Sequence, residues 1–195
     1  QTETALRVTG VPVDLPREFY LAMTKKNSIG KELAFCNVAI LRRDGSQADE
    51  NEEGEICIRG PVLGNGYLNN PEETEKTFSQ GWFHSGDLGF YQTINGEKYF
   101  FIKGRIKEII IKGGVNISPA AVEDALLKNF PEVDEVCVVG YPDTRMGEEI
   151  AAVISLKQSN SDEQSKGLAE RIVQEGGLGK LAGLSRYEAP LKVFI

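Results

Sequence analysis

The sequence has few of the residues that build metal centres and disulfide frameworks. Its 195 residues include one histidine, His84, and three widely spaced cysteines that form no Cys-x-x-Cys pair, Cys36, Cys57 and Cys137. A lone histidine disfavours a histidine-based metal site. An odd and sparse cysteine count is typical of a reducing compartment. We therefore expect a cytoplasmic protein without a disulfide framework.

The sequence also lacks long apolar runs and an excess of basic residues. No run approaches the roughly 18 apolar residues of a membrane span, and the N-terminal stretch QTETALRV has no charged-then-apolar signal pattern. The formal net charge is −7, which disfavours a general nucleic-acid binder because phosphate backbones select basic surfaces. A local anion site stays open, since a few cations and backbone amides are enough to form one.

The pattern of the first half predicts strands. The apolar content of 41% and the charged content of 26% are those of a globular protein, and the length fits one or two domains. Between turn dipeptides, strands are expected at 34–41, 55–59 and 98–103. In the second of these, Ile56 and Ile58 share one face. Residues 1–30 carry little regular pattern, and Asn70-Pro71 opens a short helix.

The pattern changes after about residue 105. A strand at 109–111 is followed by a helix that Ser118 caps and Pro119 begins, running to about Asn129. The apolar stripe of this helix is expected to contain Ala121, Val122, Ala125 and Leu126. We then expect strands at 136–141 and 150–156, a polar connector at 157–167, a helix near 168–175 and an approach to a further strand at 187–195. This alternation is typical of a small α/β unit, so the fold class is α/β (α+β) with a boundary near residues 104–107.

One glycine-flanked aspartate stands out in the first half, in the sequence His84-Ser85-Gly86-Asp87-Leu88-Gly89. In a tight turn, the two oxygens of Asp87 can accept hydrogen bonds from a vicinal diol such as a ribose. The competing interpretation is a turn aspartate that caps its own backbone, and local chemistry alone favours it.

A basic cluster precedes a pair of glycines near the expected boundary. Arg105 and Lys107 are two residues apart at a strand entrance and so share a face, where they would bind phosphate or hydroxyl groups or simply form a solvated strand edge. Gly113-Gly114 permits close approach of a ligand or forms a hairpin turn. Gly177-Leu178-Gly179-Lys180-Leu181-Ala182 fits a dinucleotide fingerprint but lacks the preceding strand, so we take it as a chance match.

Several longer motifs follow one another in a fixed order. They are Gln1-Thr2-Glu3, Gly54-Glu55-Ile56 with Gly66-Tyr67-Leu68, Asn70-Pro71-Glu72-Glu73-Thr74, Gly81 to Gly89, Gly104 to Pro119, Tyr141-Pro142-Asp143 with Gly147-Glu148, and Tyr187-Glu188-Ala189-Pro190. Taken together they resemble the adenylate-forming superfamily of acyl-CoA synthetases, peptide-synthetase adenylation domains and luciferases. Two of them depart from its pattern: Ser85 stands where threonine is usual, and no Tyr-Gly precedes Gln1.

The resemblance implies a function and a set of ligands. The family activates a carboxylic acid with ATP and Mg²⁺ to an acyl-adenylate and pyrophosphate, and many members pass the acyl group to coenzyme A. By this resemblance Thr2 contacts phosphate, Glu3 helps to hold Mg²⁺, and Asp87 and Arg105 bind the ribose. Asn116 is expected to face the nucleotide of ATP or AMP.

The same resemblance assigns domains and a hinge. Residues 1–104 correspond to the β-rich, distorted barrel-like last subdomain of the large adenylation domain, and 105–195 to the small mobile C-terminal domain. Lys107 is the expected hinge between them, and Gly113 and Gly114 are expected to line the tunnel for the thiol arm of coenzyme A. His84 is a candidate for either a structural role or a role beside the substrate.

Two motifs of the family are not found in this sequence. It has neither the phosphate-gripping loop nor the Gly-Lys motif with the catalytic lysine, so the chain is expected to be a fragment without adenylation activity of its own. Lys107 and the residues after it favour an acyl-CoA ligase. A peptide-synthetase adenylation domain and a fatty acyl-AMP ligase remain alternatives, and so does a folded remnant that acts as a binding module. The particular acid is not encoded in these residues.

Overall fold

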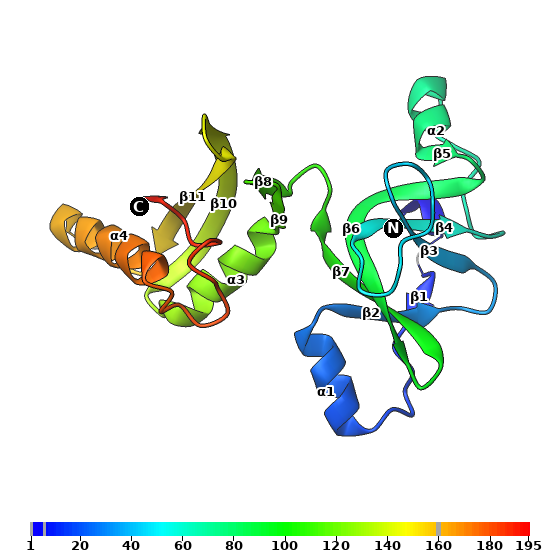
Figure 1. Cartoon of the computed structure of the whole chain (residues 1–195), viewed down its shortest axis with the longest axis horizontal. Coiled ribbons are helices and arrows are strands. Elements are labelled where there is room, and N and C mark those ends of the chain that lie inside the picture. The colour runs from blue at the N-terminus through cyan, green and yellow to red at the C-terminus, as the bar shows by residue number, and fades with distance from the viewer. Residues whose placement is uncertain (1, 6, 159–160) are drawn as a thin grey trace. The chain divides into compact units, whose positions relative to one another are not determined.

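The computed structural model describes residues 2–5, 7–158 and 161–195 (Figure 1). The chain divides into two compact units, Gln1–Ile106 and Lys107–Ile195. This division lies two residues beyond the boundary expected after residue 104. Each unit has its own sheet and its own core. Part of the expected polar connector, residues 159 and 160, lies outside the described residues.

The first unit is built around one antiparallel sheet. Its elements are η1 (Thr2–Thr4), β1 (Thr9–Gly10), α1 (Arg17–Lys25), β2 (Ser28–Glu32), β3 (Asn37–Leu41), β4 (Gly54–Arg59), α2 (Pro71–Thr77), β5 (Phe78–Ser79), β6 (Trp82–Ile94) and β7 (Glu97–Arg105). The described strands are ordered β1-β2-β7-β6-β4-β3, with β5 paired to β6. The sheet is therefore open, with β1 and β3 at the ends of this order. The first unit was expected to be barrel-like, but its described strands do not form a closed barrel.

Alternation along β4 sorts its side chains onto two faces, as the sequence predicted. Ile56 and Ile58 pack together with Phe83 and Phe100 in the main core of this unit. Cys57, between them, lies in a separate cluster with Trp82. Because successive residues of a strand point to opposite faces, both faces of β4 are covered.

The structure corrects the expectation for residues 1–30. They contain α1, which begins after Pro16 without a side-chain cap, and the start of β2, which pairs with β7. Met23 of α1 is buried in a cluster with Tyr99 and Phe101 of β7. This helix was missed because it lacks the capping residue that usually signals a helix start.

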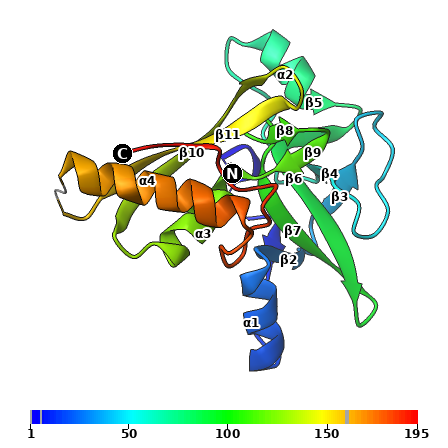
Figure 2. The same ribbon diagram turned by 60° about the vertical axis from the view of Figure 1, so that its left-hand side comes forward.

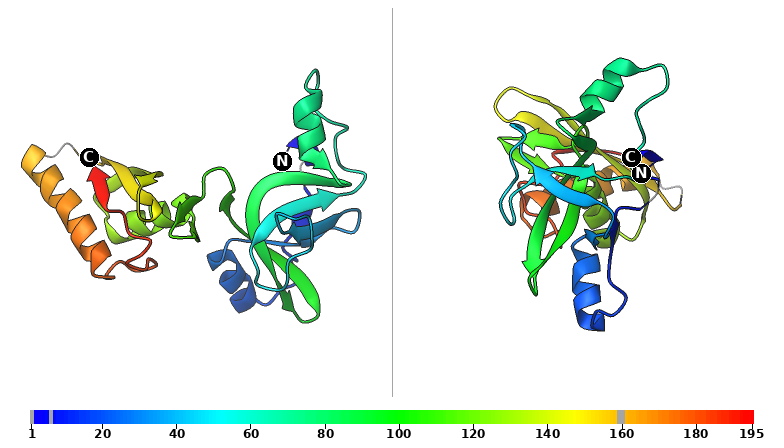
Figure 3. Two further views of the ribbon diagram at one scale, coloured as in Figure 1. Left: turned by 45° about the horizontal axis from the view of Figure 1, so that its top comes forward. Right: turned by 90° about the vertical axis from the view of Figure 1, so that its right-hand side faces the viewer.

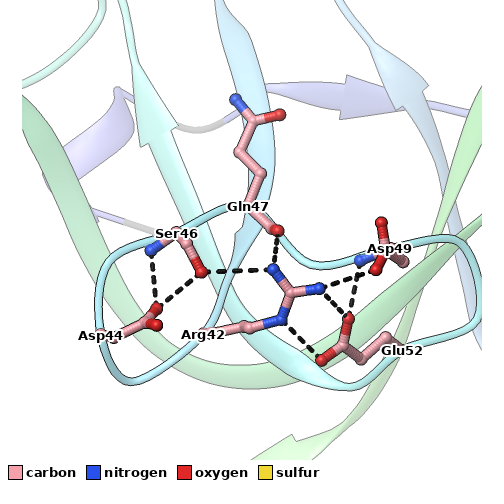
Figure 4. A network of polar contacts seen from close by, with 6 residues as sticks. All are labelled: Arg42, Asp44, Ser46, Gln47, Asp49 and Glu52. Atoms are coloured by element: carbon pink, nitrogen blue, oxygen red, sulfur yellow. Dashed lines mark hydrogen bonds and ion pairs between the residues drawn. The ribbon is translucent and has the colours of Figure 1, made fainter.

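A single arginine organises the loop between β3 and β4 (Figure 4). Arg42 Nε and Nη2 donate to the Glu52 carboxylate at 2.7 and 2.5 Å, and Nη2 also donates to Asp49 at 2.9 Å. Arg42 Nη1 donates to Ser46 Oγ and to the Gln47 carbonyl oxygen. The hydrogen bond from Arg42 is the largest of the effects that lower the pKa of Glu52. A fork-shaped guanidinium can satisfy this many acceptors at once, which fixes the loop.

In its described residues, the second unit is a smaller α/β unit of one sheet and two helices. Its elements are β8 (Ile110–Lys112), β9 (Val115–Ile117), α3 (Pro119–Asn129), β10 (Val133–Asp143), β11 (Gly147–Leu156), α4 (Asp162–Gly177) and β12 (Lys192–Phe194). The described strands are ordered β10-β11-β8-β9, and β12 pairs parallel to β11. Figure 2 labels β8, β9, β10 and β11, and Figure 3 shows α4 in orange running beside β12 in red.

The helices of the second unit begin where capping chemistry places them. Ser118 accepts a hydrogen bond from the Ala121 amide, and Pro119 is the first residue of α3, as predicted. Val122 and Leu126 of the expected stripe are buried, but Ala121 is exposed, because it lies on the side of α3 away from the core. The helix α4 starts earlier than expected, at a capping box formed by Ser161 and Gln164.

The core of this unit joins both helices to one face of the sheet. Leu126 of α3, Ile172 of α4 and Ile150 of β11 are fully buried in the same cluster.

None of the described helices is long and apolar enough to cross a membrane.

Candidate active site

Asp87 and Arg105 lie directly opposite each other in the first unit. They are paired positions of β6 and β7, and Arg105 Nη1 lies 3.1 Å from Asp87 Oδ1. The side chain of Asp87 is 15% exposed and that of Arg105 is 55% exposed. The structure therefore brings together the two residues that the resemblance assigned to the ribose, and leaves the guanidinium open to solvent.

The backbone around Asp87 departs from a regular strand. The sequence suggested a turn, but residues 82–94 form the continuous strand β6. Gly86 has a φ of +72°, a conformation that glycine adopts without steric cost. Opposite β4, Cys57 pairs with His84 and Glu55 with Leu88. Three residues of β6, 85–87, thus face one residue of β4, and they form a bulge that carries Asp87.

Glu3 is held near this site by the motif that contains Tyr67. The Tyr67 hydroxyl donates to Glu3 Oε1 at 2.9 Å, and the Gly64 amide donates to the Glu3 carbonyl oxygen at 2.8 Å. The pKa of Glu3 is lowered, first by a hydrogen bond from its own backbone amide, then by Tyr67, with a smaller contribution from the charge of Arg105. The carboxylate is therefore anionic at neutral pH, as a magnesium ligand must be.

Thr2 and Thr4 differ in their surroundings. Thr2 is exposed, whereas Thr4 is buried and lines a cavity of about 260 Å³ that Ser85 and Asp87 also line. Gln1, the first residue of this motif, lies outside the described residues.

His84 contacts Glu55 and Cys57 on the neighbouring strand. His84 Nδ1 is 2.7 Å from Glu55 Oε2 and 3.5 Å from Cys57 Sγ. Because an ionised carboxylate only accepts hydrogen bonds, Nδ1 carries the proton. The other ring nitrogen, Nε2, is buried and has no hydrogen-bond partner among the described residues. These contacts attach the ring of His84 to the neighbouring strand β4 through Nδ1.

Glu55, Cys57 and His84 are residue types that can bind a metal ion, although the single histidine of the sequence disfavoured a histidine-based metal site. Their donor atoms lie within 4.8 Å of one another. Two donors on a tetrahedral zinc ion are about 3.3 Å apart, so the 2.7 Å between His84 and Glu55 fits a hydrogen bond better. Burial, and then the charge of Glu55, raise the pKa of the Cys57 thiol to about 12, which opposes formation of the thiolate that a metal needs.

Lys107 lies at the division of the chain. It is the first residue of the second unit, it is exposed, and it belongs to a three-residue turn between β7 and β8. Hinge residues are typically a few loop positions that absorb changes in backbone dihedral angles.

Gly113 and Gly114 form the two-residue turn of the β8–β9 hairpin. Lys112 pairs with Val115 across it, and the φ values of +55° and +82° match a type I′ turn. A Cβ on Gly113 would lie 2.2 Å from the Tyr187 hydroxyl, while a Cβ on Gly114 would meet nothing within 4 Å. The hairpin thus accounts for both glycines, and the space beside Gly114 is open. Asn116 is exposed on β9, two residues beyond the turn.

Two contact residues were not named as site residues from the sequence. Tyr67 and Glu55 were noted only as parts of motifs, yet one donates to Glu3 and the other binds His84 and the amide of Gly86. No local pattern gives these contacts, because they join segments that are about 30 to 60 residues apart in the sequence. The only available signal was the recurrence of these residues inside the ordered motifs.

Comparisons with known proteins identify a family and several relatives of this chain. Residues 121–189 match the family model of the AMP-binding enzyme C-terminal domain. The medium/long-chain-fatty-acid–CoA ligase FadD8 of Mycobacterium tuberculosis is 41% identical over 132 residues, which is 68% of this chain and 22% of that protein. The oxalate–CoA ligase of Arabidopsis thaliana is 36% identical over 173 residues, 88% of this chain and 30% of that protein.

Solved structures of related enzymes match the whole chain. O-succinylbenzoate coenzyme A synthetase (MenE) from Bacillus subtilis, in complex with ATP and magnesium ion, aligns with a TM-score of 0.74 and 32% identity. The alignment covers 100% of this chain and 36% of MenE. The chain thus spans between about a fifth and about a third of the length of these relatives.

The fold and the matched motifs define a mixed α/β protein that includes an AMP-binding enzyme C-terminal domain. The chain belongs to the adenylate-forming superfamily, and the relatives named above are all CoA ligases or CoA synthetases.

Proposed function

We propose that these residues act as part of an ATP-dependent ligase that activates a carboxylic acid as its acyl-adenylate and transfers the acyl group to coenzyme A. The observation that carries the proposal is the pairing of Asp87, on the β6 bulge, with Arg105 of β7. Asp87 offers acceptors for two vicinal ribose hydroxyls, and the open guanidinium of Arg105 offers donors.

The reaction sets an electrostatic problem that the charged residues of the first unit help to solve. A carboxylate must approach a phosphate that is itself anionic, so positive charge has to be concentrated there. Glu3 fits a magnesium site because its pKa is lowered, and magnesium, when bound, neutralises phosphate charge. Thr2, exposed beside Glu3, is proposed to donate its hydroxyl to phosphate.

The roles of residues 107–116 rest on the family resemblance together with local geometry. Lys107 is proposed as the hinge, since it begins the second unit in an exposed turn. Gly113 and Gly114 are proposed to face the thiol arm of coenzyme A, and the open space beside Gly114 is compatible with that role. Asn116 is proposed to contact the nucleotide. The units 1–106 and 107–195 would then correspond to the end of the large adenylation domain and to the small mobile domain.

The proposal is tested on an intact ligase that carries these residues, with a panel of carboxylic acids. AMP release should require both an acid and ATP, and should rise when coenzyme A is added. Turnover that stops at the adenylate whether or not coenzyme A is present contradicts the choice of acceptor. Lys107→Ala should slow thioester formation more than ATP–pyrophosphate exchange, and equal loss in both half-reactions contradicts the hinge.

A further inference from the structure

One carboxylate spans the bulge that presents Asp87. Glu55 Oε1 accepts the backbone N–H of Gly86 at 2.8 Å, while its Oε2 lies 2.7 Å from His84 Nδ1. The two oxygens of one side chain on β4 thus hold two residues of β6, on either side of Ser85. The Glu55 side chain is 23% exposed, so these hydrogen bonds are partly shielded from water.

The bulge needs this carboxylate because it has left the β4 ladder. Residues 85–87 face a single residue of β4, so the N–H of Gly86 finds its partner in a side chain rather than in the neighbouring backbone. On the opposite side the bulge stays attached to the end of β7, where the Ile106 amide donates to the Gly86 carbonyl oxygen at 2.8 Å. Bulges of this kind re-aim a side chain and are frequent next to active sites.

Contacts inside the bulge complete the arrangement. The Asp87 amide donates to Ser85 Oγ at 3.0 Å, and Arg105 Nη1 donates to the Ser85 carbonyl oxygen at 3.1 Å as well as to Asp87. The position of Asp87 relative to Arg105 therefore depends on the backbone of residues 84–86. Glu55 is the side chain that holds this backbone from the β4 side.

We infer that Glu55 is a positioning residue for nucleotide binding. It keeps the bulge open so that Asp87 and Arg105 face one ribose, and His84 serves to orient its carboxylate. The inference rests on the proposed function, because it takes the ribose as the ligand of Asp87. Without the Glu55 side chain, the Gly86 amide loses its acceptor, and residues 85–87 are held to β4 only by the flanking pairs at His84 and Leu88. Misplacing a binding group through such a supporting contact typically weakens binding about tenfold or more.

The first test needs no ligand. Amide hydrogen exchange of Gly86, measured by NMR on the 195-residue chain, should be slow in the wild type and fast in Glu55→Ala. Glu55→Gln should keep the protection, since an amide oxygen still accepts the Gly86 N–H. Glu97→Gln is the matched control, because Glu97 forms an exposed ion pair with Lys31 on the same sheet. Equal exchange of Gly86 in wild type and Glu55→Ala overturns the inference.

The second test asks whether the bulge serves the ribose. AMP and 2′,3′-dideoxy-AMP are titrated into each variant. Glu55→Ala should weaken AMP binding about tenfold and leave the dideoxy compound unchanged, while Glu97→Gln should change neither. Equal weakening of both ligands, or of neither, overturns the inference. If Glu55→Ala does not fold, Glu55→Asp replaces it, because its shorter side chain withdraws the oxygens from Gly86 and keeps the charge.

The two tests separate the inference from the proposed function. If the wild-type chain binds both compounds equally, Asp87 does not bind the ribose. That result contradicts the proposed function and the role of the bulge in nucleotide binding. The exchange of Gly86 still decides whether Glu55 holds the bulge.

Discussion

Replacing Lys112 with methionine should deprive a buried carboxylate of its counter-ion. The side chains of Lys112 and Glu149 are each 6% exposed, with 2.7 Å between Nζ and Oε2. Lys112 Nζ also donates to the carbonyl oxygen of Tyr187 at 2.9 Å. The substitution leaves the carboxylate buried and unpaired, which costs about 3–5 kcal/mol.

That loss is large for a unit of this size. Small domains are stable by only about 5–15 kcal/mol, so the second unit should melt at least about 12 °C lower. Replacing both Lys112 and Glu149 with methionine removes both buried charges, and the double variant should stay within about 2 kcal/mol of the wild type. Hydrogen exchange of amides in the second unit measures its unfolding. Fluorescence of Trp82, the only tryptophan, reports the first unit and should not change.

An exposed ion pair of the same unit is the control. Lys128 and Asp124 are 3.1 Å apart, with side chains 73% and 67% exposed, so Lys128→Met should cost less than about 0.5 kcal/mol. A Lys112→Met variant as stable as Lys128→Met would refute the reasoning, and so would a double variant no more stable than Lys112→Met.

Three further predictions concern single residues. Cys137, the exposed one of the three free cysteines, should be alkylated in the native chain before the other two, as mass spectrometry would show. Gly113→Ala should destabilise the second unit more than Gly114→Ala, since only the first methyl group meets the Tyr187 hydroxyl; equal losses on chemical denaturation would contradict this. Hydrogen bonds from the backbone amides of residues 146 and 145 lower the pKa of Asp143, so its stabilising contribution is present above its unfolded pKa and lost as pH falls through the folded value. Acidification should therefore destabilise the wild type more than Asp143→Asn in urea titrations.

The sequence predicted those elements whose signals are local. The cap at Ser118 and the proline after it place the start of α3 correctly, and the alternation of Ile56 and Ile58 assigns the faces of β4. Capping and alternation depend on a few neighbouring residues, so both can be recognised in the sequence without knowledge of the tertiary structure. The start of α4 was missed because its cap follows a polar stretch that resembles a connector.

The strand β6 was missed for the reason that makes it a candidate site. Gly86 and the residues beside it interrupt the alternation of apolar side chains, and the stretch was predicted as a turn. In the structure the interruption is a bulge whose amide is satisfied by Glu55, a residue from another strand. A hydrogen bond between partners 31 residues apart is decided by strand pairing, which no local pattern encodes.

The most direct test of the account is the response of the chain to AMP. An NMR titration should shift the amide signals of Ser85, Asp87 and Arg105, and AMP should bind more tightly than 2′,3′-dideoxy-AMP. Asp87→Asn should remove most of that difference while the chain remains folded. Equal binding of the two compounds by the wild type, or signal changes confined to other residues, would contradict the assignment of Asp87 and Arg105 to the ribose.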